Sequence, residues 1–230
     1  MKALALCLSI IFCGSLCNHS FGQRFIAYDK KGRLVTTDTS KGITYLGSPY
    51  LGNTVWHQGY LMYRNQRKVP AQIAYNLVTD QLFWRLDDST EVVQALPDEF
   101  MFEGRRFIAD PYKVLKLSRV TYFEVLYDGK TSLFRRWTKQ LRPIDWKLYT
   151  SRVLPEDRFA AEYILTGDLY LQKEGDRPRF IIPTEYSLSR VLPNMGSELA
   201  NFIASHELTD QILIETLIQY DQRHSTSLAH

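Results

Sequence analysis

The chain has little cysteine, and what it has lies at one end. Of 230 residues only Cys7, Cys13 and Cys17 are cysteine. All three precede the predicted start of the mature chain, so residues 23–230 can form no disulfide in an oxidising compartment. The absence also excludes a thiol nucleophile and a zinc site with cysteine ligands. A chain of this length buries enough apolar surface to fold without covalent cross-links.

A strong excess of one charge is also missing. The chain has 28 lysine and arginine residues against 25 aspartate and glutamate residues, a formal net charge of +3. Proteins that bind nucleic acid usually concentrate positive charge, so we expect no nucleic-acid partner. After the amino terminus no apolar run is long enough for a membrane span. The balance of 45% hydrophobic and 23% charged residues is typical of a globular protein.

The first 22 residues have the pattern of a secretory signal peptide. An apolar run over residues 3–12 precedes Ser20 and Gly22, which are small side chains at the positions that a signal peptidase reads. The run is too short to cross a bilayer as an anchor. We therefore expect cleavage near Gly22-Gln23 and a periplasmic or secreted mature protein.

The rest of the chain is rich in residues that favour strands. Aromatic residues make up 13% of it, and 14 of them are tyrosines. An opening hairpin is predicted over residues 25–37, followed by a loop over residues 39–53 that is rich in Gly, Ser, Thr and Pro. From Val55 onward, short apolar runs recur at intervals of roughly ten residues, which is the spacing of an antiparallel meander.

Two hairpins are predicted in the second half. Asp128-Gly129 separates two apolar runs, and this dipeptide supplies the positive φ angles of a tight hairpin turn. We expect a second hairpin to turn at Gly167-Asp168, with residues 138–157 as a long, partly exposed excursion between the two. A last strand is expected over residues 179–183.

The apolar spacing becomes helical after Pro183. Thr184 is expected to start one helix, and Thr209 is a candidate N-cap for another, because a threonine hydroxyl accepts a hydrogen bond from an otherwise unpaired amide. Residues with helical spacing then follow each start. These residues are Met195, Leu199, Phe202 and Ile203, and then Ile212, Leu213, Leu217 and Tyr220.

These elements together predict an α+β protein. An antiparallel, aromatic-rich β-meander or roll is expected over residues 23–183. Two or three short helices over residues 184–223 pack on the same domain, and residues 224–230 form a flexible tail.

No motif for a metal, a cofactor or a known nucleophile is present. The sequence "HELTD" begins like a zinc-peptidase helix but has Asp210 where the second histidine is needed. No Gly-x-Ser-x-Gly elbow and no glycine-rich phosphate loop occur. We expect no metal and no cofactor.

Glu124 is the most unusual acidic residue, because it lies inside an apolar strand between Phe123 and Val125. A buried carboxylate of this kind is a candidate catalytic acid for a glycosidase, which needs two carboxylates. It can equally pair with an arginine across the hairpin. We favour the ion pair, since structural pairs are common at such positions.

Residues 132–149 interleave basic side chains with two tryptophans. Trp, Tyr and Arg are the usual contact residues of binding surfaces, so an anionic envelope glycan or another protein is a candidate partner. The alternative, which we favour, is a strand and loop with packed tryptophans and a solvated basic face. The candidate binding residues are Arg135, Arg136, Trp137 and Trp146.

Several segments share a hydrophobic spacing with turn residues between. They are "GSPYL" and "GYLMYRN", "IAYNLVTDQLFWR", "YFEVLYDGKTSLFRR", "AEYILTGDLYLQ", and the helical close "LSRVLPN", "ELANFI" and "LTDQILIETLIQYDQ". In these segments, which cover most of the predicted mature chain, the sequence resembles a family of exported, uncharacterised proteins that is frequent in Bacteroidetes. The resemblance implies a Gram-negative envelope or secreted setting and brings no catalytic residues.

The sequence therefore predicts an exported, non-enzymatic binding or interaction module of the cell envelope. The alternative is an envelope glycan hydrolase that uses Glu124 as its buried acid.

Overall fold

A computed structural model describes residues 24–64, 67–86, 89–110, 120–145 and 159–226. The predicted signal peptide lies outside these residues. The described chain holds thirteen strands in one sheet. In chain order they are β1 (Arg24–Tyr28), β2 (Leu34–Asp38), β3 (Ile43–Leu46), β4 (His57–Met62), β5 (Lys68–Asn76), β6 (Gln81–Arg85), β7 (Val93–Ala95), β8 (Glu99–Phe102), β9 (Arg105–Ala109), β10 (Tyr122–Asp128), β11 (Thr131–Pro143), β12 (Ala161–Lys173) and β13 (Arg179–Ile181).

The strand-rich part followed by helices confirms the predicted α+β class. Neighbouring strands follow the order β1-β2-β3-β12-β11-β10-β9-β8-β4-β5-β6-β7. The strand β13 lies off this order and pairs with β12 at Leu169–Leu171. All the strand pairs within the described residues are antiparallel except that of β3 with β12. The sheet is therefore mixed, and the chain returns from β7 to place β8 beside β4 instead of continuing a simple meander.

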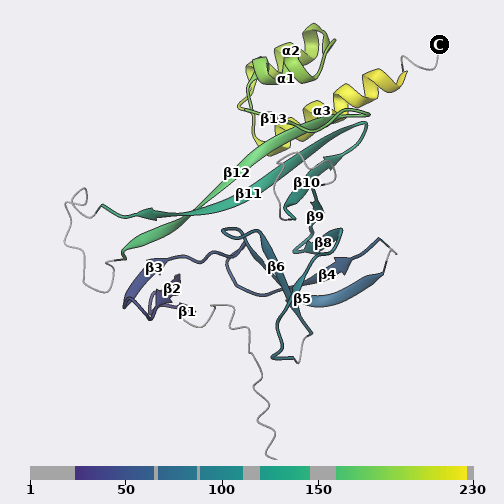
Figure 1. Cartoon of the computed structure of the whole chain (residues 1–230). Helices are drawn as coiled ribbons and strands as arrows, with labels where there is room; N and C mark the ends of the chain where they lie inside the picture. The colour runs from purple at the N-terminus through teal and green to yellow at the C-terminus, as the bar shows by residue number, and fades with distance from the viewer. Residues whose placement is uncertain (1–23, 65–66, 87–88, 111–119, 146–158, 227–230) are drawn as a thin grey trace, which may run out of the picture.

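The longest pair in the sheet is β11 with β12, which runs diagonally through the molecule in Figure 1. Its register is continuous from Thr131 opposite Lys173 to Pro143 opposite Ala161. The hairpin predicted at Gly167-Asp168 is therefore wrong, because both residues lie inside β12. The excursion predicted over residues 138–157 is also wrong as far as Pro143, because β11 continues to that residue. Residues 146–158 lie outside the described part of the chain.

The predicted loop over residues 39–53 contains a strand. Ile43–Leu46 pairs with β2 on one side and with β12 on the other. The sequence pattern did not predict this short strand because glycine and proline residues surround it. Its partner β12 is also distant in sequence, so no local signal indicates the pairing. Pairing with a distant strand outweighs weak local preference here.

The hairpin at Asp128-Gly129 is confirmed, but the turn needs glycine at position 129 for a different reason than the predicted positive φ angle. Gly129 is not among the glycines with positive φ. A Cβ on Gly129 would lie 2.4 Å from the Tyr127 hydroxyl and 2.5 Å from Asp221 Oδ2. The close approach of these two polar groups excludes a larger side chain from the turn.

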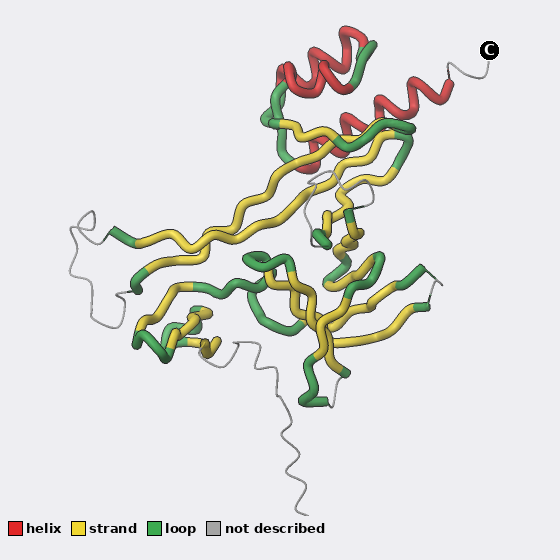
Figure 2. Tube along the Cα trace, in the orientation of Figure 1, coloured by secondary structure: helices red, strands yellow, loops and turns green. Residues whose placement is uncertain are grey.

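Three helices follow the sheet and gather at one end of the β11–β12 pair, as Figure 2 shows in red. They are α1 (Glu185–Val191), α2 (Gly196–Ser205) and α3 (Asp210–Thr226). The two predicted caps are present, because Thr184 Oγ1 accepts from Ser187 N at 3.2 Å and Thr209 Oγ1 accepts from Ile212 N at 3.4 Å. Within the described residues no helix is long and apolar enough to cross a membrane.

The helix α3 has 17 residues, so it is longer than the short helices that the sequence predicted, and it continues into the stretch predicted as a tail.

Two large apolar clusters hold the sheet. One is aromatic and lies among β4 to β10, with Phe100 and Phe107 stacked at 4.7 Å between ring centroids. The other joins the helices to β11 and β12, and contains Leu133, Leu171 and Leu217 among others. Burial of these side chains is the main favourable term that holds the helices on the sheet.

Asp221 fastens α3 to the β10–β11 turn. It is 8% exposed, and its carboxylate accepts from the Thr131 backbone amide at 3.0 Å, the Thr131 hydroxyl at 3.0 Å and the Tyr127 hydroxyl at 2.9 Å. Burial and this carboxylate raise the pKa of Tyr127 to about 12. A buried acceptor with this many donors positions the helix as well as stabilising it.

We expect Asp221→Asn to lower the free energy of unfolding by about 1–3 kcal/mol, because the amide group cannot accept from all these donors. Urea denaturation followed by circular dichroism measures the change. The same acid-to-amide change at Glu215, on the same helix and bonded to Gln211, serves as control. Equal stability losses in the two variants would contradict the role given to Asp221.

Candidate functional site

A cleft of about 660 Å³ opens beside the middle of β11. Its walls come from the loop before β4, the β8–β9 turn, β10, β11, β12 and the first residue of α3. The volume is within the range of small-ligand sites, about 300–1,000 Å³. The lining mixes an indole with charged groups of both signs, so the cleft suits a polar ligand with one flat, less polar face.

The alternation of β11 decides which basic residues face the cleft. Arg135, Trp137 and Lys139 line it at every second position. Arg136 lies between two of them, and its Nη2 is 3.2 Å from Oδ2 of Asp80, whose side chain is 1% exposed. Successive side chains of a strand point to opposite faces, so Arg136 belongs to the other face.

The structure therefore brings together two of the four predicted binding residues, Arg135 and Trp137. It turns Arg136 away from them toward Asp80, and Trp146 lies outside the described residues.

The Trp137 indole lies across the sheet from β10 toward β12. Its Nε1 donates to Glu124 Oε2 at 2.5 Å. On the other side, a Cβ built on Gly167 would lie 3.0 Å from the benzene part of the ring. Gly167 is the register partner of Trp137 in β12, and its missing side chain leaves room for the ring.

Glu124 is held by an arginine, but not by the one across its hairpin. Arg105 Nε donates to Oε1 at 2.7 Å and Arg105 Nη2 donates to Oε2 at 2.9 Å. Both carboxylate oxygens therefore accept hydrogen bonds from protein groups. A general acid needs a protonated oxygen that faces its substrate, and this arrangement supports the ion pair.

The hairpin partner of Glu124 is Arg135, and it binds a different acid. Its two Nη atoms donate to the Asp210 carboxylate, with Nη1 at 2.6 Å from Oδ2. Asp210 is the first residue of α3, so the helical unit supplies one wall of the cleft. The Nε atom of Arg135 is buried and has no hydrogen-bond partner within the described chain.

Lys139 lies two positions beyond Trp137 on the same face of β11. Its Nζ donates to the backbone carbonyls of Ser48, at 3.0 Å, and of Tyr50. Burial lowers the pKa of this amine to about 8. Loss of hydration disfavours the charged form, and these two carbonyls offset it only in part.

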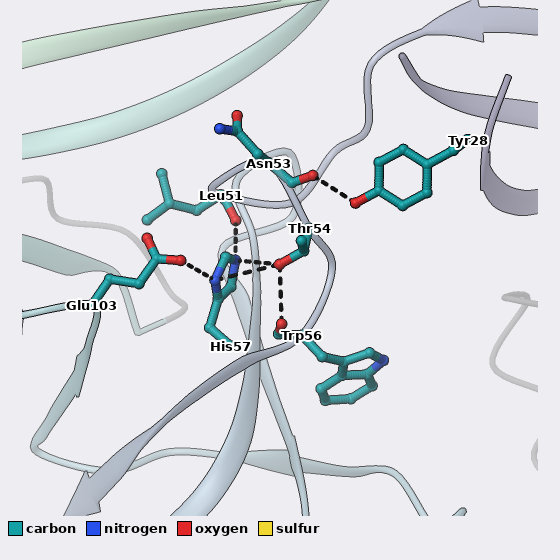
Figure 3. Close-up of polar contacts among 7 residues, drawn as sticks. All are labelled: Tyr28, Leu51, Asn53, Thr54, Trp56, His57 and Glu103. Atoms are coloured by element: carbon teal, nitrogen blue, oxygen red, sulfur yellow. Dashed lines mark hydrogen bonds and ion pairs between the residues drawn. The ribbon is translucent and has the colours of Figure 1, made fainter. Parts of the chain in front are cut away.

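The loop that forms one wall is held from below by His57 (Figure 3). The ring Nδ1 is 2.8 Å from Glu103 Oε1, and Nε2 is 3.0 Å from the Leu51 carbonyl oxygen. A Cβ on Gly52, at φ +88°, would lie 2.6 Å from the ring, so the loop needs glycine there. His57 therefore joins this loop to the β8–β9 turn.

A second anchor reaches the same loop from β1. The Tyr28 hydroxyl donates to the Asn53 carbonyl oxygen at 2.9 Å (Figure 3). The wall of the cleft is thus fixed by residues from both halves of the sheet.

Sequence reasoning missed most of the acidic and basic groups of the cleft. Glu103, Arg105 and Asp210 arrive from elements that are distant in sequence from β11. Lys139 could have been found from the alternation that starts at Arg135. Within the described residues no group of three or more His, Cys, Asp or Glu side chains could hold a metal ion.

We expect Glu124→Gln to lower the free energy of unfolding by about 1–3 kcal/mol, because it leaves the Arg105 guanidinium without its counter-charge. Thermal and urea denaturation measure the loss. The matched control is Glu162→Gln, which breaks an exposed pair with Arg142 at 2.7 Å and should cost less than about 1 kcal/mol. If the Glu124 variant is as stable as the control variant, the structural role given to Glu124 is contradicted.

In comparisons with known proteins, no family model, no curated protein sequence and no solved structure matches this chain.

Proposed function

We propose that the mature chain is an exported binding module of the cell envelope and that the cleft beside Trp137 is its ligand site. Export is supported by the amino-terminal pattern of residues 1–22 and by the resemblance of the segments described above. The observation that carries the binding role is an indole in a cleft of ligand size, surrounded by hydrogen-bonding side chains.

The shape and chemistry of the cleft favour a glycan over a protein partner. A sugar ring has a flat face of C–H groups, which packs against an indole, and an edge of hydroxyls, which need donors and acceptors. The cleft offers both, since Asn53, Thr54 and Arg135 line it together with Trp137. A stable protein interface usually buries more than about 1,000 Å² of total surface, which a recessed indole does not by itself provide.

A hydrolase remains the alternative, because Glu103, Glu124 and Asp210 all line the cleft and glycosidases use two carboxylates. Each of these carboxylates already binds a protein group: His57, Arg105 and Arg135 respectively. The arrangement supports binding better than bond cleavage.

We expect Trp137→Leu to reduce glycan binding at least tenfold, because leucine keeps apolar volume but has no flat face. Binding of the mature protein to an array of neutral and acidic oligosaccharides, followed by titration of each retained sugar, measures this. Circular dichroism checks that the variant is folded. Tyr186→Leu, which removes an aromatic ring that is 72% exposed on α1, is the matched control.

Unchanged affinity in the Trp137 variant would contradict the cleft as the site. New reducing ends in the same incubations would replace the binding role with the hydrolase alternative. If the array retains no protein while crosslinking captures one stoichiometric protein partner, the glycan assignment is overturned.

A further inference from the structure

The cations that line the cleft differ in their partners. Arg105 binds Glu124, and Arg135 binds Asp210. Lys139 lines the same cleft and makes no ion pair within the described residues. An ammonium group has three N–H donors, and two of those on Lys139 point to backbone carbonyls. Among the described residues, this half-buried positive charge in the cleft therefore has no acidic partner.

Arg135 offers no comparable charge to a ligand. Its two Nη atoms bind Asp210, and its Nε atom is buried from solvent. Among the described cations that line the cleft, Lys139 is therefore the one whose charge is not paired with an acid.

Lys139 lies two positions from Trp137 on the same face of β11, about 7 Å along the strand at about 3.3 Å per residue. The guanidinium carbon of Arg135 lies 4.9 Å from the centroid of the Trp137 ring. A sugar ring packed against the indole would thus have one edge toward Lys139.

We propose that the ligand of this cleft is an acidic glycan whose sugar unit carries a carboxylate, as a uronic acid does. The carboxylate pairs with Lys139 Nζ, and the sugar ring packs against Trp137. This inference rests on the proposed glycan-binding function and names the class of glycan.

The charge pattern favours a single carboxylate over a phosphate or a densely sulfated chain. Phosphate recognition typically uses the paired donors of an arginine. The paired donors of Arg105 and Arg135 are already bound to Glu124 and Asp210. One amine is left, and one carboxylate neutralises it.

The proposal carries a pH dependence with a defined sign. Burial lowers the pKa of Lys139 to about 8, and only the protonated amine pairs with a carboxylate. Affinity is therefore full well below pH 8 and falls as the pH rises through that value. Above pH 8 the loss of affinity approaches tenfold per pH unit. The other titratable groups that line the cleft are Glu103, Arg105, Glu124, Arg135, Tyr163 and Asp210. Burial raises the pKa of Tyr163 and sets that of Tyr50 at about 12, so neither tyrosine loses a proton near pH 8.

Isothermal titration of the mature protein with trigalacturonic acid and with neutral galactotriose, at pH 6.5 and pH 9, tests the proposal. The expected result is at least tenfold tighter binding of the acidic trimer at pH 6.5, with most of that advantage lost at pH 9. Lys139→Gln should lose the advantage at both pH values. Lys139→Arg, which keeps its charge at pH 9, should bind the acidic trimer with little change between the two. Thermal denaturation of each variant confirms that it is folded.

Equal affinity for the two trimers, abolished by Trp137→Leu, would overturn the acidic class and leave the glycan site in place. Competition by acetate as strong as that by the acidic trimer would overturn the glycan part of the proposal. The acidic class is also overturned if Lys139→Gln keeps the full preference for the acidic trimer. Binding of neither trimer, together with no retention on the oligosaccharide array, would overturn the proposed function itself.

Discussion

The hydrogen-bond ladder between β11 and β12 is the constraint on which the other contacts depend. Its thirteen paired positions run from Thr131 to Pro143 without a break. The parallel strand β3 joins β12 near Ala161, and β13 joins it near Leu171, so the two ends of one strand hold the opening hairpin and the helical unit. Because the ladder is continuous, the alternation of β11 is also continuous, and this places Arg135, Trp137 and Lys139 on one face.

Ion pairs then determine which charged side chains on that face of β11 are available to a ligand. The bidentate pair of Arg105 with Glu124 uses both oxygens of the acid that looked most like a catalyst. The start of α3 brings Asp210 to Arg135, so the arginine opposite Glu124 in the hairpin is already occupied. Pairs of this kind offset the cost of removing ions from water. Among the described residues that line the cleft, Lys139 is the cation without such a pair, so its charge is the one that a ligand can neutralise.

Local patterns predicted the class, the β10–β11 turn and the two helix caps, because each depends on residues that are near in sequence. They failed where a distant partner decides the outcome. Gly167-Asp168 looks like a turn in isolation, yet Gly167 leaves space for the side chains of Arg135 and Trp137 on the neighbouring strand. The strand Ile43–Leu46 is held by β12, and the ion pair of Glu124 comes from β9, a neighbour that the sequence pattern around Glu124 does not specify.

The parallel pairing of β3 with β12 also bears on how the chain reaches this state. Tyr45 lies opposite Ala161, and most of the sheet is synthesised between them. Contacts between such distant segments require closure of a large loop, and that entropic cost slows folding. The β4–β9 region, whose pairs are mostly between neighbours in sequence, is expected to form early, and the opening hairpin β1–β2 docks only after β12 has been made. The wall of the cleft that Tyr28 anchors would then be among the last parts of the molecule to become ordered.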